Sequence, residues 1–336
     1  MAGNYYREAP PVQAKPRRKR RWGRIVLVVA LVLLVGTGGF FFYLDTKLNR
    51  ISALTDYPGR PADTPGSNWL VVGSDSREGL SEEDREELAT GGAAGQRTDT
   101  MMLLHIPDSS ATPTLVSLPR DSYLDIPGKK KQKLNAAFAL GGPQLLVRTV
   151  ENATGLHIDH YAEIGFGGFV HIVDAVGGVD MCIDKPMKDP KAGLDLQPGC
   201  QELNGAQALG FVRTRATPRA DLDRIARQRQ FLSALVDKAT SVGTILNPFR
   251  AIPLANNTVD TLSVNEGDHL WNLMGLAWAM RGAGSGGLVT TTVPLGQSRT
   301  VAGVGAVVQW EPTKSKRFFE ALRNDTEVPK DLITTA

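Results

Sequence analysis

The feature that constrains this chain most is an uncharged apolar run, IVLVVALVLLVGTGGFFFYL, at residues 25–44. Its 20 residues are about the length that a helix needs to cross the hydrocarbon core of a bilayer. Secretory signal sequences have apolar regions of only about 7–15 residues, followed by a small-residue cleavage site. This run is longer and closes with the aromatic stretch 40–43, which is typical of a membrane interface. It therefore predicts an uncleaved transmembrane helix.

A basic tail precedes this run. Residues 1–24 contain eight Lys or Arg and one acid, Glu8, and seven of the basic residues lie between Lys15 and Arg24. Such charge holds an N-terminus in the cytoplasm, which predicts a single-pass type II protein of the cell membrane with residue 45 onward outside the cell. Removing the tail from the chain's 38 basic and 35 acidic residues leaves 30 and 34, so the remainder is mildly acidic. That balance argues against a nucleic-acid partner.

The rest of the chain is organised around one predicted domain. Residues 45–67 include DYPGRPADTPGS and predict a Pro/Gly-rich stalk. Residues 68–325 alternate short apolar runs with helical patterns, which predicts a single α/β (mixed α+β) domain with a central mixed sheet flanked by helices. Residues 326–336 are predicted to be a short, poorly ordered tail. The predicted strands are 68–73, 100–106, 113–118, 160–166, 179–184, 209–215, 288–295 and 301–310, and the predicted helices lie near 143–154, 168–175, 205–208, 222–240, 267–281 and 313–323.

The chain has two cysteines, Cys182 and Cys200. An even count outside the cell favours a disulfide over two free thiols. The bridge would close a loop of 19 residues, counting both cysteines, and would contribute about 3 kcal/mol by the chain-entropy relation.

Charged residues follow or precede three of the predicted strands. Asp75 and Arg77 come after the first, Arg97 and Asp99 come before the second, and Arg120 and Asp121 come after the third. If these strands form an antiparallel meander, the three ends share one edge of the sheet, where binding sites are common. Ion pairs at the ends of surface loops are the alternative.

Six arginines lie within residues 213–229, inside the stretch GFVRTRATPRADLDRIARQRQF. If LGFVRTR (209–215) is a strand, Phe211, Arg213 and Arg215 share one face. Two guanidinium groups about 7 Å apart at their bases suit a pair of linked phosphates, because each offers a bidentate fork. Cross-strand salt bridging is the alternative.

The helix predicted at 222–240 places polar side chains on its apolar face. At about 100° per residue its apolar residues fill an arc of roughly 140°, with Arg224 and Gln228 inside this arc and Arg227 at its border. A charge on a buried face is costly unless it has a partner. An Asp at 221 or 223 would cap the helix and direct its positive end at the same place, which predicts an anion site. Two other arginines are predicted to face solvent, Arg219 and Arg229.

The order of motifs resembles the LytR–CpsA–Psr family over about residues 68–325. The motifs are GSDSR, QRTDTMMLL, SLPRDS, KLNAAFALGG, GFVHIVDAVGGVD, LNGAQALGFVRTR and DLDRIARQ. Asp223 departs from the family pattern, in which glycine commonly precedes the arginine. High use of Ala, Gly, Arg and Val indicates a GC-rich genome, as in actinobacteria.

The resemblance implies an enzyme that transfers a glycopolymer, such as teichoic acid, arabinogalactan or capsule, from a polyprenyl-pyrophosphate carrier to peptidoglycan. The product would be a phosphodiester to the 6-hydroxyl of muramic acid. By motif match, Asp75 and Asp99 would hold Mg²⁺, with Mn²⁺ as a substitute. The pyrophosphate-binding residues would be Arg97, Arg120, Lys133, Asn135, Arg213, Arg215, Arg224, Arg227 and Gln228, and the catalytic residues Asp75, Asp99, Arg120, Arg213 and Arg215.

The same resemblance implies an apolar cavity for the lipid between sheet and helices. Its candidate wall residues, for which ordinary core packing is the alternative, are Phe138, Phe166, Phe169, Phe231, Leu232 and Leu235. Asp99 and Asp121 are candidates for the base that activates the acceptor. Two other functions stay open: a pyrophosphatase that acts on the lipid carrier with water as acceptor, and a non-catalytic membrane-bound regulator such as a transcriptional attenuator.

Overall fold

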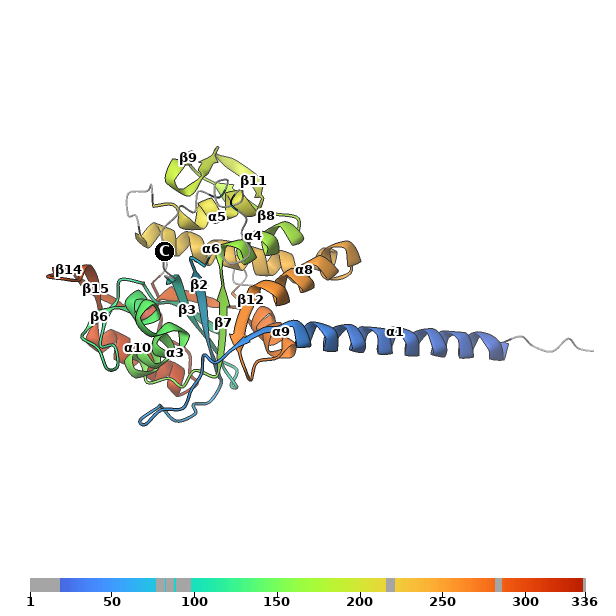
Figure 1. The fold of residues 1–336 in the computed structure, drawn as a ribbon, viewed down its shortest axis with the longest axis horizontal. Helices are drawn as coiled ribbons and strands as arrows, with labels where there is room; N and C mark the ends of the chain where they lie inside the picture. The colour runs from blue at the N-terminus through green and yellow to red at the C-terminus, as the bar shows by residue number, and fades with distance from the viewer. Residues whose placement is uncertain are drawn as a thin grey trace, which may run out of the picture. The chain divides into compact units, whose positions relative to one another are not determined.

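The computed structural model describes residues 19–76, 82, 88, 98–215, 221–281 and 286–334. The chain forms two compact units, Met1–Tyr43 and Leu44–Ala336. Helix α1 (Lys19–Lys47) contains the predicted apolar run and is drawn in blue in Figure 1. Within the described residues, the segment Trp22–Lys47 is the one helix long and apolar enough to cross a membrane, by length and composition.

A seven-stranded mixed sheet forms the centre of the second unit (Figure 1). In chain order its strands are β1 (Asn49–Ile51), β2 (Ser67–Ser74), β3 (Thr98–Ile106), β4 (Thr114–Ser117), β7 (His160–Ile164), β12 (Leu262–Asn265) and β13 (Val289–Thr292). Across the sheet the order is β1-β12-β7-β2-β3-β4-β13. The pairs β12–β7, β2–β3 and β3–β4 are antiparallel, and the other three pairs are parallel. The mixed sheet and the antiparallel meander of β2, β3 and β4 are both as predicted.

The two faces of the sheet have different cover. Side chains alternate along a strand, and Leu70 and Met101 on one face join a core with α3 (Leu134–Thr154) and α10 (Pro312–Arg323). Val71 and Met102, which are paired across β2 and β3, point to the other face, below α5 (Gly205–Arg213) and α6 (Asp221–Ala239). The predicted arrangement of helices flanking a central sheet is therefore confirmed.

Helix α3 contains a break that the sequence marks. Gly141 and Gly142 have non-helical backbone angles, and Gly142 has a φ of +64°, a region that glycine tolerates best. Pro143 follows and begins the second half, where a missing N–H does no harm. The helix predicted at 143–154 is this second half.

A second layer with its own core covers the α5–α6 side. It consists of α4 (Phe166–Ala175), two antiparallel strand pairs and the short helix η1 (Pro190–Ala192). The strands are β8 (Val179–Ile183), β9 (Met187–Asp189), β10 (Leu194–Leu196) and β11 (Gly199–Leu203). Cys182 and Cys200 lie opposite each other in the β8–β11 pair and form a disulfide, as predicted.

The prediction of a strand at 209–215 is wrong. Residues 205–213 form helix α5, which Asn204 and Gln207 start with a reciprocal capping box. The alternation of Val212 and Thr214 looked like a strand, but the cap and the good helix formers after it decide the local structure. Gly210 lets α5 pack closely, because a Cβ at that position would lie 2.9 Å from the Ala192 carbonyl oxygen.

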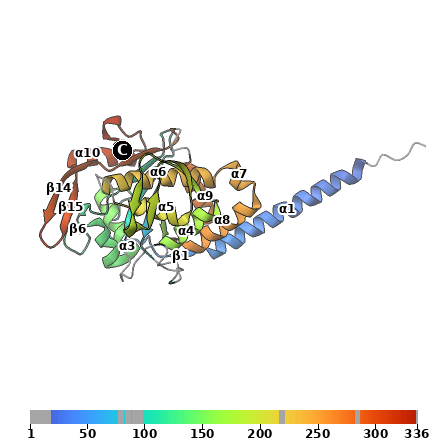
Figure 2. The ribbon, with the colours of Figure 1, turned by 90° about the horizontal axis from the view of Figure 1, so that it is seen from above.

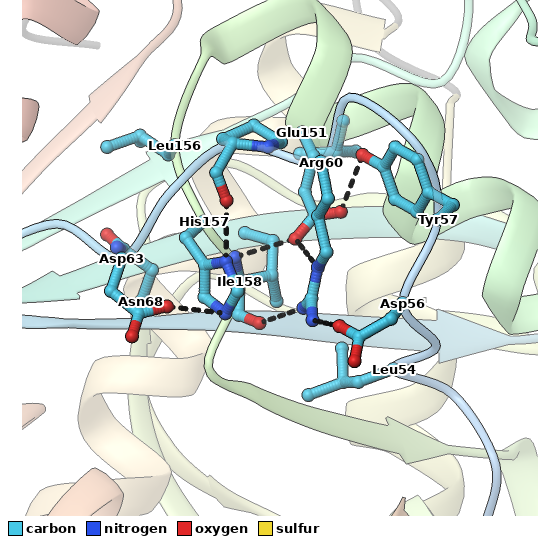
Figure 3. Close-up of polar contacts among 12 residues, drawn as sticks. Leu54, Asp56, Tyr57, Arg60, Asp63, Asn68, Glu151, Leu156, His157 and Ile158 are labelled. Carbon is cyan, nitrogen blue, oxygen red and sulfur yellow. Dashed lines mark hydrogen bonds and ion pairs between the residues drawn. The ribbon is translucent and has the colours of Figure 1, made fainter.

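The segment 45–67, predicted as a stalk, is part of the domain in the structure. It supplies the edge strand β1, and Ala53 is fully buried in the main core. Figure 3 shows the polar contacts that fix it to the end of α3: buried Glu151 accepts hydrogen bonds from Tyr57 Oη (2.8 Å), Arg60 Nε (3.0 Å) and the Ile158 N–H (3.0 Å). The composition predicted a linker because it carries no information about such partners.

The remaining elements complete the domain. Three helices that follow α6 are α7 (Val242–Ile245), α8 (Pro248–Thr261) and α9 (Leu270–Ala279), of which only α9 was predicted. Two hairpins are formed by β5 (Tyr123–Leu124) with β6 (Gln132–Lys133) and by β14 (Leu295–Val301) with β15 (Gly305–Trp310). Val328 and Leu332, the latter in the short helix η3 (Lys330–Leu332), are buried in the main core, so this part of the predicted tail is packed.

Candidate functional site

A cavity of about 380 Å³ lies between the sheet and helices α5 and α6. Its apolar lining includes Val71 and Met102 from the sheet and Phe231 and Leu232 from α6. Its charged lining comprises five cations and two carboxylates: Arg120, Lys191, Arg213, Arg215, Arg224, Asp99 and Asp189. An apolar volume next to an excess of positive charge fits a ligand with an apolar chain and an anionic head.

The strand ends supply one side of this cavity. Gly73 and Ser74 at the end of β2, Asp99 at the start of β3 and Arg120 after β4 all line it. The β2–β3 pairing shifts register between Gly73 and Ser74, and such bulges are frequent beside functional sites because they re-aim side chains. The predicted convergence of the three strand ends is present.

A chain of ion pairs holds Arg120. Its Nη1 donates a short hydrogen bond to Asp99 Oδ1, and its Nε lies 3.6 Å from Asp121 Oδ2. Lys133 Nζ in turn donates to Asp121 Oδ1 at 2.7 Å. Arg120 and Asp99 line the cavity, whereas Asp121 and Lys133 stand behind them. Lys133 is therefore placed to orient the pair through Asp121.

Helix α5 ends at the cavity with two arginines. Arg213 lies in its last turn, donates from Nη1 to the Leu88 carbonyl (2.8 Å) and stacks over the Phe166 ring at 4.9 Å. Arg215 follows two residues later and is exposed. Both line the cavity although they do not share a strand face as predicted. They converge because the helix terminates there.

Helix α6 fixes that terminus. The last carbonyl groups of a helix have no partners within it, and two α6 side chains provide them. Arg227 Nη2 donates to the Thr214 carbonyl at 2.6 Å, and Gln228 Nε2 donates to the Val212 carbonyl at 3.1 Å. Arg227 does not line the cavity, whereas Gln228 does. Arg227 thus positions the chain that carries Arg213 and Arg215.

The other α6 arginines are buried. Arg224 is 4% exposed and lines the cavity, as predicted from its place on the apolar face. Arg229, predicted to face solvent, is 6% exposed, because α6 is covered on more sides than its apolar arc indicates. Burial lowers the pKa of the Arg227 and Arg229 guanidinium groups, and the Asp223 carboxylate partly opposes this at Arg227. Both stay charged at neutral pH because a guanidinium pKa starts so high.

The predicted apolar wall divides into two sets. Phe166, Phe169, Phe231 and Leu232 line the cavity. Phe138 packs in the main core and Leu235 in the core of the second layer, so for these two the ordinary-core alternative holds.

Two charged residues of the cavity were not predicted from the sequence, Asp189 and Lys191. Asp189 Oδ2 accepts a hydrogen bond from Thr214 Oγ1 at 2.7 Å, next to the end of α5. Both residues lie within the loop that the Cys182–Cys200 disulfide closes. The signal in the sequence was indirect: a loop that is cross-linked and carries charge.

The remaining predicted residues lie around this centre or outside the described part. Asp75 follows Ser74 at the same strand end and does not itself line the cavity. Asn135 donates its backbone N–H to the Arg120 carbonyl (3.1 Å) and also lies outside the lining. Arg77, Arg97 and Arg219 fall outside the described residues.

The oxygen groups at the strand ends fit a hard cation. Within the described part of the chain, no three His, Cys, Asp or Glu side chains cluster to hold a metal ion by themselves. Mg²⁺, however, commonly takes one or two carboxylates and completes its shell with phosphate and water. Asp99 lines the cavity, and so does Ser74, whose buried Oγ has no hydrogen-bond partner among the described residues. A hydroxyl oxygen is among the oxygen ligands that such a cation accepts, so the residues present fit it.

Comparison with known proteins assigns the chain to a family. The model of the LytR_cpsA_psr family matches residues 46–324. The chain belongs to that family. The match begins before the predicted domain boundary at 68, in agreement with the packing of the segment 45–67 onto the domain.

Relatives are similar over most of the chain. A protein named "Probable cell wall biosynthesis protein LcpB" from Corynebacterium glutamicum is 52% identical over 324 residues, which are 96% of this chain and 76% of that protein. The "Polyisoprenyl-teichoic acid--peptidoglycan teichoic acid transferase TagU" of Oceanobacillus iheyensis is 32% identical over 269 residues, 73% of this chain and 78% of that protein. A solved structure described as "TagT bound to LIIa-WTA" superposes with a TM-score of 0.59 and 25% identity, over 82% of this chain and 96% of that one.

Proposed function

We propose that this protein is a phosphotransferase that moves a glycopolymer from a polyprenyl-pyrophosphate carrier to peptidoglycan outside the cell membrane. One observation carries the proposal: a single cavity joins apolar walls to a cluster of arginines at strand and helix ends. The family supports it, since TagU is named as a transferase of teichoic acid to peptidoglycan. The apolar helix α1 supplies an anchor that keeps the domain near a lipid-borne donor.

The proposed reaction exchanges a phosphoanhydride bond of the carrier for a phosphoester bond to the acceptor. An oxygen of the acceptor, the 6-hydroxyl of muramic acid, attacks the phosphorus next to the sugar. The bond from that phosphorus to the bridging oxygen breaks, and polyprenyl phosphate leaves with the electron pair. The hydroxyl proton passes to a base; of the two candidates, Asp99 lines the cavity and Asp121 does not.

The protein's share of this chemistry is positioning and charge neutralisation, as in other phosphoryl transfers. Arg213, Arg215 and Arg224 would bind the pyrophosphate oxygens, and Arg120 would be held in place for the same task by Asp99. Bidentate guanidinium–phosphate contacts fix orientation as well as charge. The apolar wall at Phe231 and Leu232 would take the first part of the prenyl chain.

A divalent cation fits the same place. Asp99 and Asp75 would hold Mg²⁺ or Mn²⁺, with Ser74 Oγ beside them, and the ion would neutralise phosphate charge as it develops. Removal of divalent cations with a chelator should abolish transfer, and Mg²⁺ or Mn²⁺ should restore it while Ca²⁺ restores it less, because Ca²⁺ prefers more ligands at longer distances.

The test is a transfer assay with the full-length protein in vesicles, a labelled lipid-linked sugar donor, Mg²⁺ and peptidoglycan. Label joined covalently to glycan supports the proposal. Label released in soluble form at the same rate with and without peptidoglycan would indicate a pyrophosphatase. Absence of turnover by folded protein that binds the donor would indicate a regulator, and either of these results would overturn the transferase.

A further inference from the structure

A second surface of the domain is rich in exposed apolar side chains. Helices α8 and α9, with the residue that follows α7, expose a set of large apolar side chains, here called the apolar face: Leu246, Phe249, Ile252, Trp271, Met274 and Trp278. Phe249 is 88% exposed, and the two tryptophans are 63% and 68% exposed. None of these residues lines the cavity. Large exposed apolar side chains that gather in one part of a domain often mark a place of interaction.

Helix α9 reverses the usual amphipathic pattern. Trp271, Met274 and Trp278 are spaced by three and four residues, so they form one stripe along the helix. This stripe is exposed, whereas Leu273 and the cap residue Met280 are buried. His269 stacks on the Trp271 ring at 4.1 Å between centroids and holds it in its exposed position. A soluble surface helix would carry polar residues on that stripe.

The segment 239–281, which carries the apolar face, has few charged residues, of both signs: Arg250 and Arg281 are basic, and Asp260, Glu266 and Asp268 are acidic. Helices α7 and α9 contain no Asp, Glu, Lys or Arg, and the first charged residue after Lys238 is Arg250. Arg250 stands on α8 between Phe249 and Ile252 and is exposed. Arg281, just beyond α9, lies over the Trp278 ring at 5.2 Å. Aromatic rings with arginines at their rim suit a layer that is apolar below and anionic above.

The contacts of α8 and α9 with the end of α1 indicate which layer the apolar face meets. Residues 44–47, the last of α1, belong to the same compact unit as α8 and α9. Asp45 Oδ1 accepts the Leu270 N–H at 2.8 Å and so satisfies the start of α9. Lys47 Nζ lies 3.6 Å from Asp260 Oδ1 near the end of α8. Both helices are therefore fixed to residues 44–47, where the apolar span ends. Figures 1 and 2 show α8 and α9 at one end of the domain.

We infer that the apolar face lies in the interface of the bilayer that α1 crosses, as an interfacial contact in addition to the span. Trp and Tyr concentrate at this depth because their rings are apolar and their N–H or O–H groups are polar. Arg250 and Arg281 would meet lipid phosphates. The contact would hold the domain in one orientation above the membrane. The inference rests on the proposed anchoring by α1 but not on the transfer reaction.

The test uses quenching of tryptophan emission by lipids with brominated acyl chains. The full-length protein carries Trp22→Phe, because Trp22 belongs to the apolar helix and would be quenched for that reason alone. This background protein is compared, in phosphatidylcholine–phosphatidylglycerol vesicles with and without bromine, with the same protein carrying Trp271→Phe and Trp278→Phe. We expect quenching of two of the four remaining tryptophans in the background protein and its loss in the second variant.

A matched control replaces Trp310, which donates to Ser122 Oγ inside the domain, by Phe in the same background and should leave the quenching unchanged. Equal quenching with and without Trp271 and Trp278 would overturn the inference. Blue-shifted emission that resists bromine and rises with the protein-to-lipid ratio would also overturn it, in favour of a second copy of the chain. Resistance of the protein to extraction at alkaline pH reports the anchor separately, so failure of the interfacial contact is distinguishable from failure of anchoring or transfer.

Discussion

Where β2 and β7 begin, buried charge is matched within the protein, and where the same strands end, positive charge is in excess around a cavity. At the first end, Glu151 has no exposed surface and accepts three hydrogen bonds, including one from Arg60 (Figure 3). At the other end, five cationic side chains and two carboxylates line a cavity of about 380 Å³.

This difference between the two ends of the sheet indicates that one end stabilises the fold and the other binds a ligand. A buried ion pair that is fully hydrogen-bonded is costly to break, because loss of one partner leaves the other charge without compensation. An excess of cations around a cavity repels itself, and an anionic ligand relieves that repulsion. The first end should therefore affect folding when mutated, and the second should affect ligand binding and turnover.

The largest expected effect is on stability, at the end of the sheet where β2 and β7 begin and buried charge is matched, here called the matched end. Glu151→Gln leaves Arg60 beside a neutral amide, and we expect the free energy of unfolding to fall by about 3–5 kcal/mol. Denaturant unfolding of the full-length protein in detergent measures this, and Glu266→Gln, at an exposed position, is the matched control. Transfer activity per folded molecule should not change. A loss of activity without a loss of stability would contradict the division between the two ends.

The cavity end should respond in the opposite way. Arg213→Ala or Asp75→Ala should lower the rate of transfer by about 10²–10³-fold, by analogy with the removal of other electrostatic stabilisers. The melting temperature should stay close to that of the unchanged protein. Lys188→Ala is the control, since Lys188 is exposed, pairs with Asp195 and does not line the cavity. A fully active Arg213→Ala protein would refute the assignment of the site.

The disulfide should affect both the stability of the fold and the binding of the donor. Replacing Cys182 and Cys200 together by Ala should reduce the free energy of unfolding by up to about 3 kcal/mol, from the length of the closed loop. Because the loop carries Asp189 and Lys191 into the cavity, the affinity for the lipid-linked donor should fall as well. A reducing agent should produce both changes in the unchanged protein and neither in the variant. Donor affinity that is insensitive to both treatments would show that the loop does not contribute to binding.

The smallest expected effect is a pH dependence at the matched end. Burial raises the pKa of Asp159, although the Asn68 N–H donates to its Oδ2 at 2.7 Å and two histidines lie near. A carboxyl with a raised pKa in the folded state is most compatible with folding when protonated, so it reduces stability as pH rises through that pKa. Asp159→Asn should therefore be more stable than the unchanged protein at pH 7.5, with a smaller advantage at acidic pH. Unfolding measured at several pH values checks this, and an advantage that grows toward acid would contradict it.

Some of the site followed from local sequence patterns. Three apolar strands, each with an acid or an arginine at one end, were sufficient to place Asp99 and Arg120 together, because antiparallel strands bring alternate ends to one edge. The buried face of α6 was sufficient to identify Arg224, because an arginine within an apolar arc is unusual. The apolar run of α1 predicted a membrane helix by its length alone.

Other features required the packed structure. The helix α5 was mistaken for a strand, since two alternating residues outweighed a capping signal at Asn204 that was present in the sequence. Arg227 was predicted as a phosphate ligand, yet its guanidinium donates to the Thr214 carbonyl. Asp189 and Lys191 reach the cavity from a separate layer, and their sequence neighbourhood contains no motif that predicts this.

The sequence by itself determined which segments are apolar, which side chains carry charge and, where the element type was predicted correctly as for α6, on which side of the element each residue lies. Only the tertiary structure decided which neighbour covers each side: Arg224 meets a cavity, Arg227 a backbone carbonyl and Arg229 the protein interior. The physical reason is that periodicity is defined relative to the axis of one element, whereas the cost of burying a charge depends on the groups that other elements bring to it.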